Sequence, residues 1–281
     1  MAELISIIVT TYNREDALDA VLRSLARQSD DDFEIIVADD GSGPATASLI
    51  ESWKPKIGRR LEHAWHEDLG FCPAESRNRA VRIARGAYCV FLDGDCIVRP
   101  DFVAMHRKLG ERGFFVTGNR VLLSQELTMK VLREKLSPGT WGPARWLSER
   151  WRGGVNRLAP LLYLPLGPVR RLRRAAWRGA RSCNLAIWYS DLIRVDGFDA
   201  EYKGWGKEDS DIIVRLLHAG VHRKDGVFAT GVIHLWHPEA DQSLLSENEH
   251  KLANVVATDR IRAQRGLSSL QGMPAVDASV S

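Results

Sequence analysis

Short runs of consecutive apolar residues alternate with stretches of helical periodicity along the first third of the chain. Three of these runs are rich in β-branched residues, as in strands that are buried on both faces: residues 4–9, 33–38 and 88–92. Apolar residues at helical spacing predict a helix over about 17–25, and a second helix is expected near 73–85. This alternation predicts βαβ units and a mainly parallel central sheet flanked by helices, the α/β class.

From about residue 124 the pattern changes to helical and irregular pieces. Regular elements resume with an expected strand at 182–188, a helix over about 208–219 and a strand near 227–233. The residues after about 266 are small, polar and aperiodic, so we expect them to be frayed or disordered. The predicted division of the chain is 1–122, a basic helical insertion at 123–180, a further part of the same domain at 181–265, and a tail at 266–281.

The composition is that of a globular protein, with 44% apolar residues, 27% charged residues and a net charge of +3. No secretory signal is visible, and the longest apolar stretch, at about 159–169, contains prolines and is shorter than the roughly 20 residues that span a bilayer. The four cysteines lack zinc-ligand spacing and are expected to be reduced thiols. We therefore expect a cytoplasmic protein, at most peripheral at the inner face of the membrane.

Polar clusters follow three of the predicted strands: residues 10–14 (TTYNR), 39–42 (DDGS) and 93–95 (DGD). Each one alone also fits an ordinary turn. Because open parallel sheets bind ligands beyond the carboxyl ends of their strands, the three clusters should line one edge, where a ring and carboxylates suit a nucleoside. Asp93 and Asp95 offer oxygen ligands to a divalent ion that would hold a diphosphate. There is no glycine-rich P-loop to hold it instead.

Two further clusters lie far along the chain. Residues 204–211 (GWGKEDSD) present a tryptophan between glycines and then carboxylates at a predicted helix start, which fits either a functional site or a plain helix cap. Residues 234–238 (HLWHP) follow a predicted strand. A single histidine is usually structural, but His234 and His237 together could contribute a nitrogen ligand to the same ion.

These motifs together resemble family-two glycosyltransferases of the GT-A (Rossmann-like) type. The first half carries T-x-Y-N-R, D-D-G-S, S-R-N-R-A (76–80) and D-G-D, and the second half resembles a galactosyltransferase-like module through D-G-F-D (196–199) and G-W-G-K-E-D. The resemblance covers about residues 4–122 and 181–240. It implies transfer of a sugar from a nucleotide-sugar donor, with UDP as the expected nucleotide, to a hydroxyl acceptor, usually with inversion at the anomeric centre.

The resemblance also implies roles at matching positions. The donor's base, ribose and diphosphate would be contacted by Thr10, Tyr12, Arg14, Asp40, Arg77 and Asp93. Asp95 would coordinate Mn²⁺ or Mg²⁺, with Asp93, His234 and His237 as further candidate ligands that the sequence does not separate. Asp209 falls where the family places its catalytic base, and Trp205 and Glu208 lie on the acceptor side.

The middle segment concentrates basic charge, because residues 130–181 contain 13 Lys and Arg against two acids. Tryptophans are interleaved with these arginines, which suits an anionic membrane surface or a phosphorylated or lipid-linked glycan acceptor. The alternative is a solvated helical insertion whose tryptophans pack on the catalytic domain. Nucleic acid is not an expected partner, because no reader fold accompanies the charge.

Other functions fit part of the pattern: a non-catalytic nucleotide-sugar or glycan binding protein, a nucleotidyltransferase, or a transferase with a protein acceptor. Pure binding needs no base, whereas this chain keeps a candidate base beside the metal motifs. A nucleotidyltransferase would show a glycine-rich loop where residues 10–14 stand. The expected acceptor is a cell-surface polysaccharide or lipopolysaccharide intermediate, and the sequence specifies neither the sugar nor the linkage.

Overall fold

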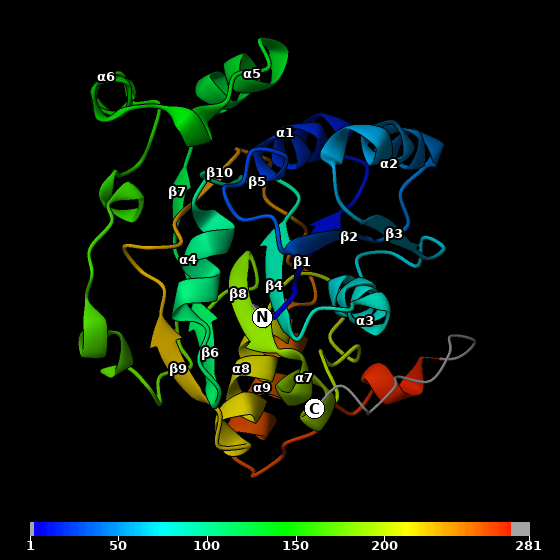
Figure 1. Cartoon of the computed structure of the whole chain (residues 1–281). Helices are drawn as coiled ribbons and strands as arrows, with labels where there is room; N and C mark the ends of the chain where they lie inside the picture. The colour runs from blue at the N-terminus through cyan, green and yellow to red at the C-terminus, as the bar shows by residue number, and fades with distance from the viewer. Residues whose placement is uncertain (1–2, 271–281) are drawn as a thin grey trace.

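The computed structural model describes residues 3–270, which fold around a main β-sheet with helices on both faces (Figure 1). Within them, this sheet has seven strands in the order β3-β2-β1-β4-β8-β6-β9. Strands β1 to β4 pair in parallel, β8 is antiparallel to both of its neighbours, and β6 and β9 are parallel. Their bounds are β1 Ile5–Thr11, β2 Phe33–Asp39, β3 Leu61–Trp65, β4 Tyr88–Asp93, β6 Phe114–Thr117, β8 Asn184–Trp188 and β9 His222–Asp225. The predicted α/β class with a mainly parallel sheet is confirmed.

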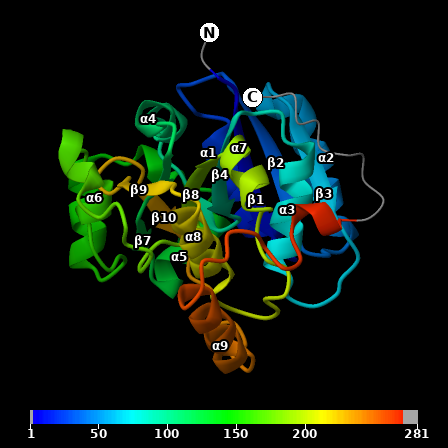
Figure 2. The same ribbon diagram turned by 90° about the horizontal axis from the view of Figure 1, so that it is seen from below.

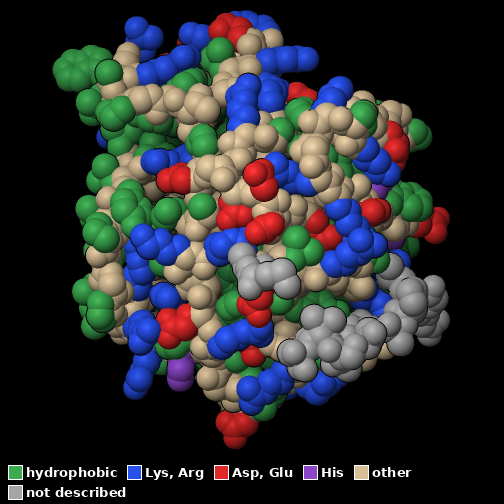
Figure 3. Space-filling model, in the orientation of Figure 1, with side chains coloured by type: hydrophobic (Ala, Val, Ile, Leu, Met, Phe, Trp, Pro, Cys, Tyr) green, Lys and Arg blue, Asp and Glu red, His purple; other side chains and the backbone are tan. Residues whose placement is uncertain are grey.

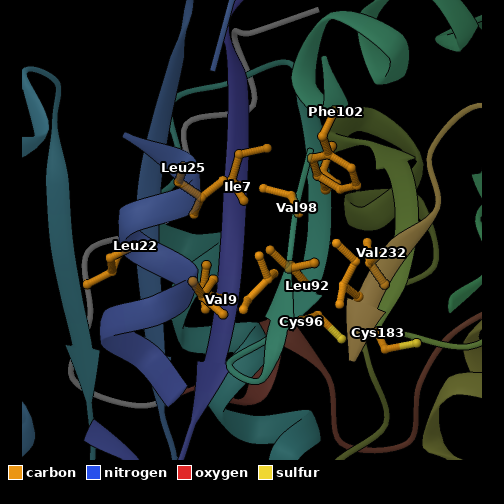
Figure 4. Close-up of a cluster of buried hydrophobic side chains, with 14 of the residues drawn as sticks. Ile7, Val9, Leu22, Leu25, Leu92, Cys96, Val98, Phe102, Cys183 and Val232 are labelled. Carbon is orange, nitrogen blue, oxygen red and sulfur yellow. The ribbon is translucent and has the colours of Figure 1, made fainter. Parts of the chain in front are cut away.

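Most of the helices in the described chain connect these strands and cover the sheet. They are α1 Glu15–Leu25, α2 Pro44–Ile57, α3 Pro73–Ile83, α4 Phe102–Leu109, α7 Tyr189–Arg194 and α8 Glu208–His218. A further helix, α9 Leu245–Val256, follows the last strand and packs on α8. In β1, Ile7 and Val9 pack with α1, whereas Ile8 joins the apolar cluster of α3 and α8 on the other side. The two-residue period of a strand thus distributes one continuous apolar run between two cores. Figure 4 shows Ile7 of β1 beside Leu25 of α1.

A second, smaller sheet joins distant parts of the chain. It has the order β5-β10-β7, with bounds β5 Cys96–Ile97, β10 Val232–His234 and β7 Arg120–Leu122. Strand β10 is antiparallel to β5 and parallel to β7, and His234 lies opposite Cys96. The segment after β4 is therefore fixed beside the segment that ends β10.

The middle segment consists of short helices, as its pattern indicated. They are α5 Gln125–Arg133, α6 Pro143–Trp151 and the 3₁₀ helices η1 Pro138–Thr140, η2 Ala159–Leu161 and η3 Gly167–Arg171. Both ribbon views place α6 at an outer edge of the molecule, away from α2 and β3 (Figures 1 and 2). None of the helices in residues 3–270 combines the length and apolar character needed to cross a bilayer.

The structure contains elements that the pattern did not predict, among them α2, β3, α4, β6 and α9, and it differs from the pattern at the end of the chain. The expected strand at 227–233 contributes only Val232–His234, and β9, just before it, was not predicted. The predicted disordered tail, 266–281, was also placed too early in the sequence, because its first residues are ordered. The 3₁₀ helix η4, Leu267–Ser269, is ordered because Leu267 is buried in the core beside α3 and its N–H donates to the carbonyl of Asp196 at 2.9 Å. Residues 271–281, the rest of that predicted tail, lie outside the described residues.

Candidate active site

The polar clusters after β1, β2 and β4 lie at one edge of the main sheet, as predicted. Strand β1 lies between β2 and β4, and Thr10 is opposite Asp93 in the register. The Thr10 hydroxyl donates to Oδ1 of Asp93 at 3.2 Å. Gly94 is required by this close approach, because a Cβ at that position would collide with the carbonyl oxygen of Thr10. Glycine therefore lets the turn with Asp93 and Asp95 lie directly against the end of β1.

The predicted nucleoside contacts divide into an exposed and a buried group. Tyr12 is exposed, and its hydroxyl donates to Oδ2 of Asp68 at 3.0 Å. Asp40 is buried, and its two oxygens accept from the N–H of Cys72 at 2.8 Å and the hydroxyl of Ser76 at 2.7 Å. Tyr12 is thus free to present its ring to a base, whereas Asp40 already holds the loop after β3 in place.

Asp95, His234 and His237 form a cluster of candidate metal ligands, which the smaller sheet assembles. Nε2 of His234 lies 3.5 Å from Oδ1 of Asp95, and Nε2 of His237 lies 3.5 Å from Oδ2. The Nδ1 atom of His237 is 2.6 Å from the carbonyl oxygen of Pro238. Since a carbonyl can only accept, Nδ1 carries the hydrogen and Nε2 keeps its lone pair for a metal.

The electrostatics of this cluster favour a bound cation. Burial raises the pKa of Asp95, and the nearby Asp93 raises it further, while the two histidines oppose the shift. Burial lowers the pKa of His234, so its imidazole is neutral and able to act as a ligand. One carboxylate with two imidazoles, and Asp93 alongside, is a donor set that suits Mn²⁺ and related divalent ions. The residues present therefore fit the metal that the resemblance implies.

The predicted acceptor-side residues lie on a turn and on the start of α8. Residues 204, 206 and 207 all have positive φ, so the chain reverses sharply and Glu208 and Asp209 enter the first helical turn. Trp205 is 40% exposed between the two glycines. The N–H of Gly204 donates to the carbonyl of Phe71 at 3.1 Å, which ties this turn to the loop after β3. Both loops therefore face the same region.

Arg77, on α3, links the two acidic motifs. Its buried guanidinium donates from Nη1 to Oε1 of Glu208 at 3.1 Å, and Nη2 lies 3.6 Å from Oδ1 of Asp93. Burial raises the pKa of Glu208 to about 7, with Asp209 contributing and Arg77 opposing. Burial also raises the pKa of Asp209, again against the influence of Arg77. A single buried cation thus contacts Asp93, a candidate metal-side carboxylate, and Glu208, a candidate acceptor-side carboxylate.

Arg120, in β7, belongs to this region but matches none of the motifs. Its Nη1 atom lies 3.9 Å from Sγ of Cys183. Burial lowers its pKa, but the surrounding Cys183, Cys96, Asp93 and Asp95 outweigh that effect and raise it. Arg120 reaches the metal cluster only because β7 pairs with β10, and nothing in the local sequence signals that pairing. Arg14 also lies near this cluster, because its charge lowers the pKa of Asp95, and its side chain pairs with Asp16 at 3.2 Å.

Family models match most of the chain. The model described as glycosyl transferase family 2 matches residues 6–159, more than half of the chain. The chain belongs to glycosyl transferase family 2. A second model, described as the N-terminal domain of galactosyltransferase, matches residues 172–236 of this family-2 chain. The matches extend further into the middle segment than the resemblance over 4–122 and 181–240 indicated, because α5 and α6 lie within the first of them.

Curated relatives and solved structures agree with this assignment. The chain is 28% identical over 232 residues to validoxylamine A glucosyltransferase of Streptomyces hygroscopicus subsp. limoneus, covering 78% of this chain and 49% of the relative. It is 25% identical over 239 residues to Escherichia coli chondroitin synthase, covering 78% and 33%. The chain therefore spans half or less of the length of these relatives.

Two structures show the same fold at low identity. S. aureus TarS 1–349 in complex with UDP has a TM-score of 0.60 at 17% identity, covering 94% of this chain and 68% of that one. The mannosyltransferase PcManGT of Pyrobaculum calidifontis, in complex with GDP-Man and Mn²⁺, has a TM-score of 0.57 at 16% identity, covering 92% and 73%. The fold of the family-2 chain is GT-A.

Replacing Arg77 by alanine should lower the free energy of unfolding by about 3 kcal/mol or more, because it leaves the buried Glu208 carboxylate and the partly buried Asp93 carboxylate without their cation. Urea unfolding measures the change. The matched control is Arg79→Ala on the same helix, which removes a more exposed ion pair with Glu75 and should cost about 1 kcal/mol or less. Equal losses of free energy of unfolding in the two variants would show that the buried ion pairs of Arg77 contribute no more than the more exposed pair of Arg79.

Proposed function

We propose that this family-2 chain is a metal-dependent glycosyltransferase that moves a sugar from a nucleotide-sugar, with UDP as the expected nucleotide, to an acceptor hydroxyl with inversion of configuration. The observation that carries the proposal is the position of Arg77, which holds Asp93 of the metal motif and Glu208, the neighbour of the expected base, on one guanidinium. Motifs that lie far apart in the sequence thus border one region. The UDP bound to TarS and the GDP-Man and Mn²⁺ bound to PcManGT support a nucleotide-sugar donor.

The donor side of the mechanism depends on a divalent ion and on aromatic and cationic groups. Asp95, His234 and His237, with Asp93 beside them, would hold Mn²⁺ or Mg²⁺. When bound, the ion neutralises charge that develops on the departing diphosphate. The exposed ring of Tyr12 stacks on the nucleobase, and Arg77 stabilises the carboxylates around the diphosphate. Thr10, Arg14 and Asp40 are the remaining donor-side residues of this proposal.

The acceptor side depends on α8. Asp209 accepts the proton of the acceptor hydroxyl as its oxygen attacks the anomeric carbon. Glu208, whose pKa is about 7 and which receives a hydrogen bond from Arg77, positions the acceptor next to it. The half-exposed indole of Trp205 offers a flat face to a sugar ring, which favours a glycan over a protein as acceptor. A single displacement that uses only this base inverts the anomeric centre.

The proposed acceptor is a glycan or lipid-linked glycan, such as an intermediate of cell-surface polysaccharide or lipopolysaccharide, used at the inner face of the cytoplasmic membrane. The E. coli relative named chondroitin synthase supports a glycan acceptor, since its name refers to a polysaccharide product. The relative named validoxylamine A glucosyltransferase is named for a small molecule, so the comparisons do not agree on an acceptor class and Trp205 is the main support for a glycan.

A thermal-shift panel of UDP-sugars and GDP-sugars, with and without Mn²⁺, tests the donor. A UDP-sugar at about 100 times its Kd stabilises the folded chain by about 2.7 kcal/mol, which raises Tm by roughly 5 °C or more. We expect this shift only when Mn²⁺ is present. A larger shift with GDP-sugars would contradict UDP, and a shift without any transfer or donor hydrolysis would favour the non-catalytic binding protein.

A further inference from the structure

The arginines of the middle segment do not all belong to its surface. Arg170 is buried, and its guanidinium donates to three backbone carbonyl oxygens at 2.7 to 2.8 Å. Arg171 donates to the carboxylate of Glu111 at 2.8 Å. Arg170 therefore holds η3 against β9 and the loop after it, and Arg171 ties η3 to the segment between α4 and β6. The basic run at 170–174 is therefore partly structural, and charge reversal there would disturb the fold.

The tryptophans of this segment also divide into side chains that pack on the protein and one that is exposed. Trp146 is buried, and its ring centroid lies 5.0 Å from that of Trp141, which is partly buried against the core. Trp177 is partly buried between α8 and α9. Packing on the catalytic domain thus accounts for three of the four. Trp151 is different, because it is 90% exposed at the end of α6.

Helix α6 presents apolar side chains on its outer face as well as on its inner face, which is unusual for a surface helix. Its buried residues are Trp146 and Glu149. At 3.6 residues per turn, Ala144, Leu147 and Trp151 fall together on the opposite face, which points away from the protein. Leu147 is 61% exposed, and Ala144 is also exposed. A surface helix normally presents polar residues to solvent, so the exposure of this apolar face to water is unfavourable.

Cations border this apolar face on both sides. Arg150 follows it on one flank, and Arg145 and Arg152 lie on the other, all three exposed. The only acid of α6, Glu149, is buried on the inner side. Figure 3 shows hydrophobic side chains together with Lys and Arg at the corner that α6 occupies in Figure 1. An apolar stripe between arginines is complementary to a surface with an apolar interior and an anionic boundary.

The same surface continues onto α5 and reaches the candidate active site. The N–H of Ser124, just before α5, donates to the carbonyl of Gly154, just after α6, at 2.8 Å. Met129 of α5 is 61% exposed, with Lys130 exposed beside it. On the inner side of α5, the hydroxyl of Thr128 accepts from the N–H of Trp236 at 2.8 Å, between the two metal-site histidines.

We infer that the outer face of α6, with Leu147 and Trp151 as its apolar anchors and Arg145, Arg150 and Arg152 at its flanks, docks on an anionic lipid bilayer. The charge and exposure of α6 carry this inference, and it does not depend on the catalytic roles proposed above. Docking through α6 places the loop of His234 and His237 close to the membrane surface, since α5 joins the two.

Vesicle co-sedimentation of the full chain tests this inference. Vesicles of phosphatidylcholine mixed with an equal part of phosphatidylglycerol should bind the protein, and pure phosphatidylcholine vesicles should bind it at least about tenfold more weakly. Raised salt should weaken the binding because it screens the arginines. Leu147→Ser with Trp151→Ser, and separately Arg150→Glu with Arg152→Glu, should each reduce binding by about tenfold or more. All four side chains are exposed, so folding should be unaffected.

Matched controls separate α6 from general charge and from catalysis. Lys54→Glu with Lys56→Glu, on exposed positions of α2, reverses the same amount of charge and should leave binding within about twofold. Asp209→Asn should bind vesicles like the unaltered protein, so failure of the proposed reaction would leave this result intact. Binding that persists in both α6 variants, or that never exceeds binding to phosphatidylcholine, overturns the inference. Self-association in ultracentrifugation that Trp151→Ser abolishes, without vesicle binding, would instead identify a contact between two copies.

Discussion

Replacing Asp209 by asparagine is expected to lower the rate of sugar transfer by about a hundredfold or more, with donor binding retained. Asparagine keeps the shape of the side chain and can still accept hydrogen bonds, but it cannot take the proton of an attacking hydroxyl. Burial raises the pKa of Asp209, which makes the carboxylate a better base than an exposed aspartate, and Arg77 limits that rise. The substitution therefore removes proton acceptance while leaving the start of α8 in place.

Initial rates of transfer measure the loss of catalysis in Asp209→Asn, and thermal shifts caused by the donor measure whether donor binding is retained. Glu247→Gln provides the control, since Glu247 also lies in the first turn of an exposed helix, α9, and should leave the rate unchanged. Glu208→Gln is expected to cost less than Asp209→Asn, because glutamine can still accept the hydrogen bond from Arg77. A rate close to that of the unaltered protein in Asp209→Asn would exclude it as the base, and a larger loss in Glu208→Gln would transfer the role to Glu208.

Removing divalent cations with EDTA is expected to abolish transfer, and Mn²⁺ or Mg²⁺ should restore it. The ion would neutralise much of the charge that the departing diphosphate acquires, so we expect a loss of several orders of magnitude without it. Asp95→Asn and His234→Ala should raise the Mn²⁺ concentration needed for half-maximal activity by about tenfold or more. His237→Ala should do so less strongly, because its side chain is 39% exposed compared with 9% for His234.

The pH dependence of Mn²⁺ activation follows from competition between the metal and protons. Because burial raises the pKa of Asp95, protons compete for its carboxylate at higher pH than for an ordinary aspartate. The pKa of His234 is lowered, so that imidazole stays available to lower pH. The half-saturating Mn²⁺ concentration should therefore rise as the pH falls. His250→Ala, at an exposed position of α9, is the control. Full activity in EDTA would refute the metal assignment.

The strands and the polar residues at their ends could be predicted because both depend on local sequence. A continuous apolar run identifies a buried strand, and the carboxyl ends of neighbouring parallel strands necessarily share an edge. The pattern of residues alone therefore places Thr10 and Asp93 together, as the register of β1 with β4 confirms. The start of α8 was also readable, because acids follow a glycine-rich turn at residues 204–207.

The remaining features depend on contacts between distant segments. Strand β5 has two residues and carries no periodic signal, yet it brings His234 beside Asp95. Arg120 reaches that cluster through the pairing of β7 with β10. In the middle segment, Trp146 and Trp151 lie on the same short helix, α6, but Trp146 is buried and Trp151 is 90% exposed. Whether such a side chain is buried or exposed depends on tertiary packing, which the composition of the segment does not indicate.

Gly94 limits how this family-2 chain can vary at the turn that carries Asp93 and Asp95, the candidate ion-binding turn. The space beside the carbonyl of Thr10 cannot accommodate even a methyl group, so no larger residue can separate the two acids unless β1 or the turn moves. The restriction comes from the neighbouring strand and not from an unusual backbone angle, since Gly94 is not among the residues with positive φ. Any retuning of the site for another metal or another sugar therefore has to come from the ring of residues around the turn, because its central position is closed to substitution.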